Sequence, residues 1–148
     1  MKTFAIICVL LLTPFMCEEE NELPVSGVVK LEFRLAQDYK ADGLEKRIFK
    51  NDTIYLHEKI ELSNSDIALV SKNELKDGIS FTFNNKGNEK ISKLSVIGFG
   101  KLLAIIVDDK ILVAPKIMGK VSGKVQITGY FTEKEIDEIF EELTKTEY

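Results

Sequence analysis

Residues 101–117 read KLLAIIVDDKILVAPKI, and this stretch decides the fold. Two apolar runs, 102–107 and 111–114, flank the pair Asp108-Asp109. Short apolar runs separated by a polar reversal predict two adjacent strands joined by a tight turn. Aspartate tolerates turn backbone geometry, so the paired carboxylates are interpreted as structural. A cation site would need further oxygen ligands from elsewhere in the chain and is kept as an alternative.

Four other segments have the sequence pattern of strands. Apolar and polar residues alternate along 28–35, 53–62 and 79–83, as expected where one face of a strand is buried. Residues 125–128 (VQIT), ended by Gly129, predict a last strand. The polar residues 36–50 predict a loop. Together with the hairpin, about six strands are expected, and tight connections predict a mostly antiparallel sheet.

Three segments have the pattern of helices. Ser63-Asn64 can cap a short helix over 65–72, and a second helix is expected to follow the break at 84–87 and to run to Val96. The clearest helix follows Thr132, which forms a capping box with Glu135 ahead of an apolar stripe. That stripe consists of Ile136, Ile139, Phe140 and Leu143. The prediction is an α+β domain with about three helices packed on one face of the sheet.

The N-terminus has the pattern of a secretory signal. Residues 1–16 combine a positive start with a short apolar run. Cys17, followed by glutamates, resembles the acylated cysteine of a bacterial lipoprotein, although Met16 stands where a small residue is usual. We therefore expect a signal over 1–16, lipidation of Cys17, a flexible tether over 17–27 and a folded domain over 28–148. Secretion and an uncleaved signal anchor are the alternatives.

Composition excludes some classes of function. The 148-residue chain has a net charge of −4, so the basic surface of a nucleic-acid binder is missing. Cys8 lies in the signal and Cys17 is expected to be acylated, which leaves no thiol for catalysis or metal binding. His57, the only histidine, is expected on the exposed face of a strand. A hydrolase built from His57, Asp108 and Asp109 lacks a recognisable constellation, so no enzyme activity, metal or cofactor is expected.

Four segments, in order, resemble the head region in the large extracytoplasmic domain of SecD, the membrane subunit that assists the Sec protein-export channel. They are LEFRL (31–35), LSNSDI (62–67), 101–115 and VQITGYFT (125–132). Asp109 departs from the pattern, because the family usually has glycine there. The signature residues, expected to be structural, are Phe33, Arg34, Ala104, Asp108, Ala114, Pro115, Gly129 and Phe131.

The resemblance implies a polypeptide-binding role, because the family's head is thought to contact emerging polypeptides. A full SecD continues into a base subdomain and membrane spans that use the proton gradient, whereas this sequence stops at Tyr148. We expect a stand-alone, membrane-tethered extracytoplasmic domain that binds polypeptide or an envelope protein and is accessory to export. The alternative is a small-molecule-binding or inhibitor lipoprotein that reuses the fold; a deep apolar cavity would favour it.

Overall fold

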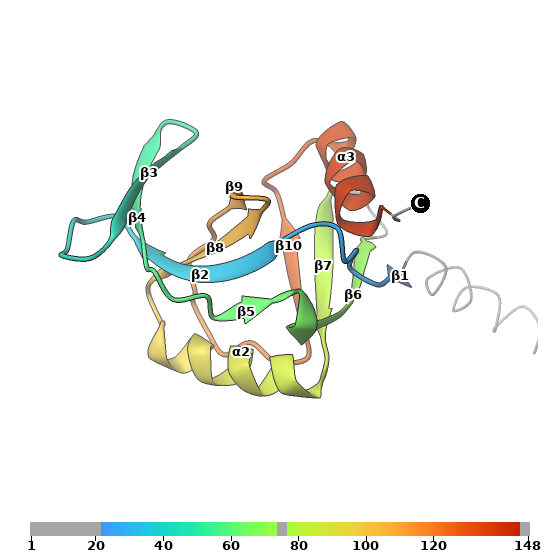
Figure 1. Ribbon diagram of the computed structural model, residues 1–148, viewed down its shortest axis with the longest axis horizontal. Coiled ribbons are helices and arrows are strands. Elements are labelled where there is room, and N and C mark those ends of the chain that lie inside the picture. The colour runs from blue at the N-terminus through green and yellow to red at the C-terminus, as the bar shows by residue number, and fades with distance from the viewer. Residues whose placement is uncertain (1–21, 74–76, 146–148) are drawn as a thin grey trace, which may run out of the picture.

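The computed structural model describes residues 22–73 and 77–145, and within them the strands form two antiparallel sheets (Figure 1). One sheet has the order β1-β6-β7-β10; the other has the order β3-β4-β2-β8-β9, with β5 paired to β2. The elements are β1 (Glu22–Leu23), β2 (Leu31–Gln37), β3 (Glu45–Phe49), β4 (Asp52–Leu56), β5 (Leu62–Ser63), the 3-10 turn η1 (Asn64–Asp66), β6 (Ile67–Lys72), β7 (Gly78–Phe83), α2 (Asn85–Ile97), β8 (Leu102–Val107), β9 (Lys110–Val113), β10 (Lys124–Thr128) and α3 (Glu133–Thr144).

The hairpin predicted at 101–117 is confirmed as β8 and β9. Asp108 and Asp109 form its two-residue turn with φ values of 48° and 68°, the left-handed geometry that matches the twist of paired strands. Ile105 pairs with Val113, but the next residue, Ile106, pairs with Ile111. Leu112 therefore has no partner of its own in β8 and is an extra residue in β9. Such a bulge re-aims a side chain, and Leu112 packs against the main core.

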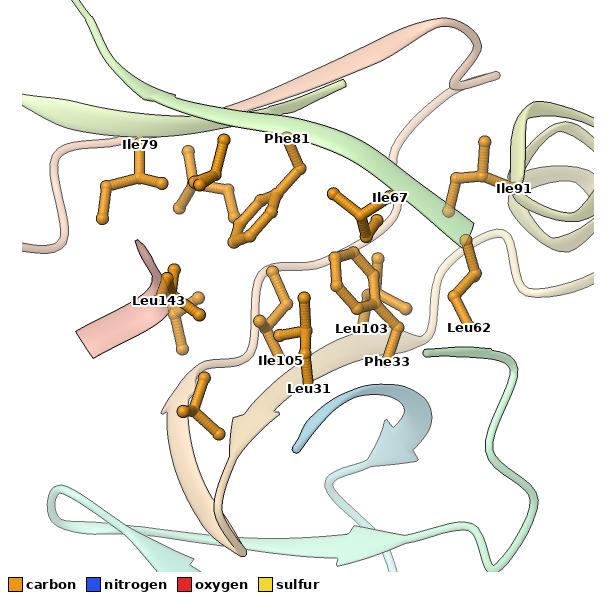
Figure 2. Close-up of a cluster of buried hydrophobic side chains, with 14 of the residues drawn as sticks. Leu31, Phe33, Leu62, Ile67, Ile79, Phe81, Ile91, Leu103, Ile105 and Leu143 are labelled. Atoms are coloured by element: carbon orange, nitrogen blue, oxygen red, sulfur yellow. The ribbon is translucent and has the colours of Figure 1, made fainter. Parts of the chain in front are cut away.

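The main core lies between the two sheets (Figure 2). Alternate residues of β2 face inward, and Phe33 makes edge contacts with Phe81 and Phe83 of β7 at ring-centroid distances of 5.5 and 6.2 Å. Aromatic pairs of this geometry contribute about 0.5–1.5 kcal/mol each beyond the area they bury. The contacts of Phe33 therefore hold one sheet against the other.

A second, smaller cluster covers the opposite face of β8. Ala104 and Ile106 point into it, while Leu103 and Ile105 point into the main core. Ile54 and Leu56 of β4 complete this cluster, with Phe49 of β3 packed against it. Burial on both faces explains why β8 has an uninterrupted apolar sequence.

Several expectations about the strands are corrected. The loop expected over 36–50 contains β3, and the strand expected over 53–62 ends at Leu56 before the chain returns as β5. The helix expected over 65–72 is the single turn η1 followed by β6. β6 pairs with β7, the next strand along the chain, and this pairing outweighs the local capping signal. The single sheet expected is in fact two.

The helices also differ from the expectation that they share one face. Within the described ranges there are two α-helices, and they lie on opposite sides of the molecule (Figure 1). α2 contacts η1, β5 and β7, whereas α3 contacts β6 and β7. The capping box of α3 is confirmed: the Glu135 N–H donates to Thr132 Oγ1 over 3.2 Å, and the Thr132 N–H donates to Glu135 Oε1 over 2.9 Å.

The turn η1 is a polar junction that joins the start of β2 to α2. Asn64 Oδ1 accepts the N–H of Leu31 over 2.7 Å, and its amide nitrogen donates to the carbonyls of Val29 (2.7 Å) and Ser26 (3.1 Å). The fully buried Asp66 accepts the Ser63 N–H over 3.0 Å, and Lys90 Nζ of α2 lies 3.1 Å from both its oxygens, with a hydrogen bond to Oδ2. The SNSD segment therefore ties the start of β2 to α2.

The described chain begins with β1, which pairs with β6 through Glu22–Ser71 and Leu23–Val70. The Ser26 N–H donates to the carbonyl of Leu143 over 2.7 Å. The expected signal and Cys17 lie outside the described residues, and the tether boundary at residue 27 stays a prediction. No helix in the described part of the chain is long and apolar enough to cross a membrane.

Candidate functional site

The carboxylates of the hairpin turn hold structural contacts. Asp108 Oδ1 accepts the N–H of Lys30 over 2.9 Å, and the Asp108 N–H donates to the Lys30 carbonyl over 2.9 Å. Asp109 Oδ1 lies 2.7 Å from Nη2 of Arg47, whose Nη1 donates to the Asp109 carbonyl over 3.1 Å. Each aspartate therefore fixes the hairpin to a different neighbouring segment.

His57 is half-buried just beyond β4, so the expectation of full exposure on a strand is wrong. Its Nε2 lies 3.2 Å from Gln37 Oε1, and its carbonyl accepts Arg34 Nε over 2.8 Å. Burial, followed by the charge of Lys101, lowers the pKa of His57 from its ordinary value of 6.5. These contacts fix the imidazole beside the last residue of β2.

The histidine and the paired aspartates are not brought together. Asp108 contacts Lys30, just before β2, whereas His57 contacts Gln37 at its end. A strand of 7 residues separates them by roughly 20 Å at about 3.3 Å per residue. In residues 22–73 and 77–145, no group of three or more histidine, cysteine or acidic side chains could hold a metal ion.

The signature residues take part in packing or in backbone geometry. Phe33 and Ala104 are fully buried, and Ala114 and Phe131 pack at the margins of the two clusters. The Pro115 carbonyl accepts the Leu103 N–H over 2.8 Å, and Gly129 has a φ of +83° that favours glycine. A binding role for any of them stays untested.

A groove of about 370 Å³ separates the β8–β9 hairpin from α3 and is the candidate binding site. Its apolar lining comes from both walls: Val107 and Leu112 from the hairpin, and Ile139 and Leu143 from α3. The bulge in β9 provides the extra residue Leu112 in the hairpin wall. β9 ends its sheet within the described residues, so one side of its backbone has no strand partner there.

The charged residues of the groove are mostly acidic. Asp108, Glu138 and Glu142 line it together with a single base, Lys110. Glu142 also pairs with Lys145 over 3.1 Å at the surface. An apolar floor with an acidic rim and a free strand edge suits an extended polypeptide that carries apolar and basic side chains.

Sequence reasoning identified only part of this groove. Ile139 and Leu143 belong to the predicted stripe of α3, but Glu138, Glu142 and Leu112 were not singled out. The spacing of Glu138 and Glu142, four residues apart beside the stripe, is the signal that could have found the acidic rim. The bulge that adds Leu112 has no comparable sequence signal.

A void in the main core is too small for a small-molecule ligand. It lies between Ile79, Phe81 and Ile105, among others, and measures about 10 Å³. That volume is at the lower limit for a single water molecule. It does not provide the deep apolar cavity that the small-molecule alternative would need.

Two solved structures share this fold. A structure of SecDF in a super-membrane-facing form aligns with a TM-score of 0.56 and 21% identity, covering 78% of this chain and 19% of that chain. A second structure aligns with a TM-score of 0.53 and 20% identity, covering 75% of this chain and 60% of that chain. It is described as the structure and function of a membrane component SecDF that enhances protein export. The two-sheet α+β arrangement is therefore that of a domain found in SecDF.

Sequence comparison specifies the domain. Residues 40–144 match the family model described as SecDF, P1 head subdomain, and the chain belongs to this family. The protein translocase subunit SecD of Aquifex aeolicus is 30% identical over 136 residues, covering 82% of this chain and 27% of that protein. The same subunit of Elusimicrobium minutum is 27% identical over 118 residues, covering 77% of this chain and 25% of that protein. The chain thus spans about a quarter of the length of these relatives.

Proposed function

We propose that this protein is a non-enzymatic, membrane-tethered extracytoplasmic domain that binds extended polypeptide during protein export. The groove between β9 and α3 is its binding site. The family is consistent with this role, because a solved SecDF is described as a membrane component that enhances protein export. An envelope protein with an exposed extended segment is a partner of the same kind.

One observation carries the proposal: β9, the last strand of its sheet within the described residues, lines the same groove as the apolar side chains of α3. An added strand would gain main-chain hydrogen bonds along β9, which are independent of sequence. Its alternate side chains would enter the space between Leu112 and Ile139. The acidic rim would favour segments with lysine or arginine, so binding is broad but depends on charge.

Site-specific crosslinking in intact cells tests the site. A photoreactive residue is placed at Glu138, on the groove rim, or at Glu141, an exposed acid of α3 that does not line the groove. We expect polypeptide adducts from position 138 and few from position 141. Equal yields from both positions, or none from either, would contradict the proposed site.

A peptide-binding measurement separates the proposed ligand class from others. The full chain is titrated with a fluorescent peptide of alternating lysine and leucine, and with a matched peptide of alternating glutamate and leucine. We expect only the basic peptide to bind, with an affinity that falls as salt is added. Equal binding of the two peptides would remove the acidic groove as the recognition element.

The tether is a separate part of the proposal. Cys17 is the expected lipid attachment site, so Cys17→Ser is expected to move the protein from the membrane fraction to the soluble fraction. Metabolic labelling with a fatty acid provides the direct readout. Unlabelled wild-type protein would favour a secreted protein or an uncleaved anchor instead.

A further inference from the structure

Charge is segregated along the chain. Residues 91–107 contain two lysines and no acid, and residues 111–131 contain three lysines and no acid. The whole chain nevertheless carries 24 acidic and 20 basic residues. Any surface built from these two segments is therefore basic, although the net charge of the protein is −4.

The structure joins these two segments into one surface. The Gly100 N–H donates to the carbonyl of Ile117 over 2.8 Å, and the Ile117 N–H donates to the carbonyl of Lys101 over 2.8 Å. The end of α2 therefore lies beside the segment that follows β9. We define the lysine–apolar surface by Lys93, Val96, Ile97 and Lys120, which line one hollow, together with the exposed residues next to them, Phe99 after the end of α2 and Met118 before Lys120.

Four large apolar side chains of this surface are exposed to solvent. Their exposed fractions are 65% for Val96, 78% for Ile97, 60% for Phe99 and 67% for Met118. An isolated exposed apolar residue needs no explanation, but a cluster on one surface indicates an interaction site. Side chains this exposed protrude from the domain, which suits insertion into a soft surface.

Lysines are the charged residues that line the hollows of this surface. A shallow hollow of about 380 Å³ is lined by Ser92, Lys93, Val96, Ile97 and Lys120. A neighbouring hollow shares Lys120 and adds Lys116 and Met118, again with lysine as its charged lining among the described residues. The nearest acid along α2, Glu89, lies one turn before Lys93, toward the other end of the helix.

We propose that the lysine–apolar surface docks onto an anionic phospholipid membrane. Lysine ammonium groups would meet the lipid phosphates, while Phe99, Ile97 and Met118 would enter the boundary between headgroups and acyl chains. Neither segment contains an acid, so no carboxylate within them repels a negatively charged bilayer. This site is separate from the β9–α3 groove and goes beyond the proposed polypeptide binding.

The sequence allows a direct test, because it contains no tryptophan. Phe99→Trp places a single tryptophan on the surface of the full chain. Tyr39→Trp places one at an exposed position between β2 and β3 as the matched control. Each protein is mixed with vesicles of brominated phosphatidylcholine, prepared with or without phosphatidylglycerol. Both variants carry the same N-terminal segment, so any difference in quenching between them comes from the position of the tryptophan.

We expect bromolipid quenching of Phe99→Trp to rise about threefold or more when phosphatidylglycerol is present, and to fall again in high salt. Replacing Lys93, Lys116 and Lys120 with glutamine should abolish this rise, and Tyr39→Trp should show none. Met118→Trp gives a second reporter in case Phe99→Trp perturbs folding, which circular dichroism checks.

Three results would overturn the proposal. The first is bromolipid quenching at Phe99→Trp and Met118→Trp that does not exceed the quenching at Tyr39→Trp. The second is a rise in quenching with phosphatidylglycerol that persists after the three lysines are replaced. The third is a Phe99→Trp emission that shifts when an acidic peptide is added but shows no bromolipid quenching, which would identify a protein-binding surface instead.

Discussion

Gly87 lies directly against the carbonyl oxygen of Asp66: a Cβ added at Gly87 would be 2.0 Å from that oxygen. Gly87 is in the first turn of α2, where the Asn84 side chain caps the helix by accepting the Gly87 N–H over 2.9 Å. The sequence pattern suggested a break at residues 84–87, but the helix begins there. Gly87 is present because α2 packs on η1 more closely than any side chain would allow.

Gly87→Ala should destabilise the protein by about 2–4 kcal/mol, because backbone atoms rather than a flexible side chain must move. In a solvent-exposed helix the same change would be stabilising, so the sign of the effect reports the packing. Urea unfolding measures it. Gly119→Ala, where an added Cβ meets nothing within 4 Å, is the control and should change stability by less than about 0.5 kcal/mol.

Asn64→Asp should lower the free energy of unfolding by about 2–3 kcal/mol. The change keeps an acceptor for the Leu31 N–H but replaces the amide donor with a carboxylate oxygen facing the carbonyls of Val29 and Ser26. Thermal and urea unfolding provide the measurement. Asn51→Asp, the same chemical change in the exposed turn between β3 and β4, should have little effect. Similar losses in both variants would show that added negative charge is responsible.

The stability of the protein should fall as the pH drops below 6.5, with a contribution from His57. Burial and then Lys101 lower the pKa of this imidazole in the folded state, while Glu61 opposes them. The unfolded chain therefore takes up the proton at a higher pH than the folded chain, which favours unfolding as the pH falls from 6.5 toward the folded-state pKa.

The difference in unfolding free energy between wild type and His57→Gln isolates this contribution. Urea unfolding between pH about 7.5 and about 5.5 should show a smaller loss of stability in the variant, because glutamine does not titrate. Parallel curves would mean that His57 has the same affinity for protons in both states.

Glu138→Lys should weaken binding of the basic peptide about tenfold, because it reverses a charge on the groove rim. Fluorescence anisotropy at low salt measures the dissociation constant. Glu141→Lys makes the same charge change on the same helix outside the groove, so it should leave binding within about threefold of wild type. A similar loss from both substitutions would indicate attraction to α3 as a whole.

Sequence patterns predicted the elements whose signals are local. The β8–β9 hairpin follows from two apolar runs and an aspartate pair, and α3 follows from its capping box and stripe. These features depend on residues within a few positions of one another, so a single sequence contains all the information needed.

Features that depend on contacts outside the segment itself were not predictable in this way. Ile67–Lys72 looked helical from its cap, but β7 provides the backbone partners that make it a strand. The same limitation applies to the groove: the pattern of α3 shows that Ile139 and Leu143 form an apolar stripe, but only the tertiary structure places Leu112 opposite them.

The placement of α2 and α3 on opposite sides gives the protein an electric polarity (Figure 1). α3 contains six carboxylates, whereas lysines lie around the end of α2 and along 116–124. Near a negatively charged surface, such a molecule experiences a torque that turns its lysine end forward before any contact is made. A domain that arrives in this orientation has α3, on the opposite side of the molecule, turned away from that surface.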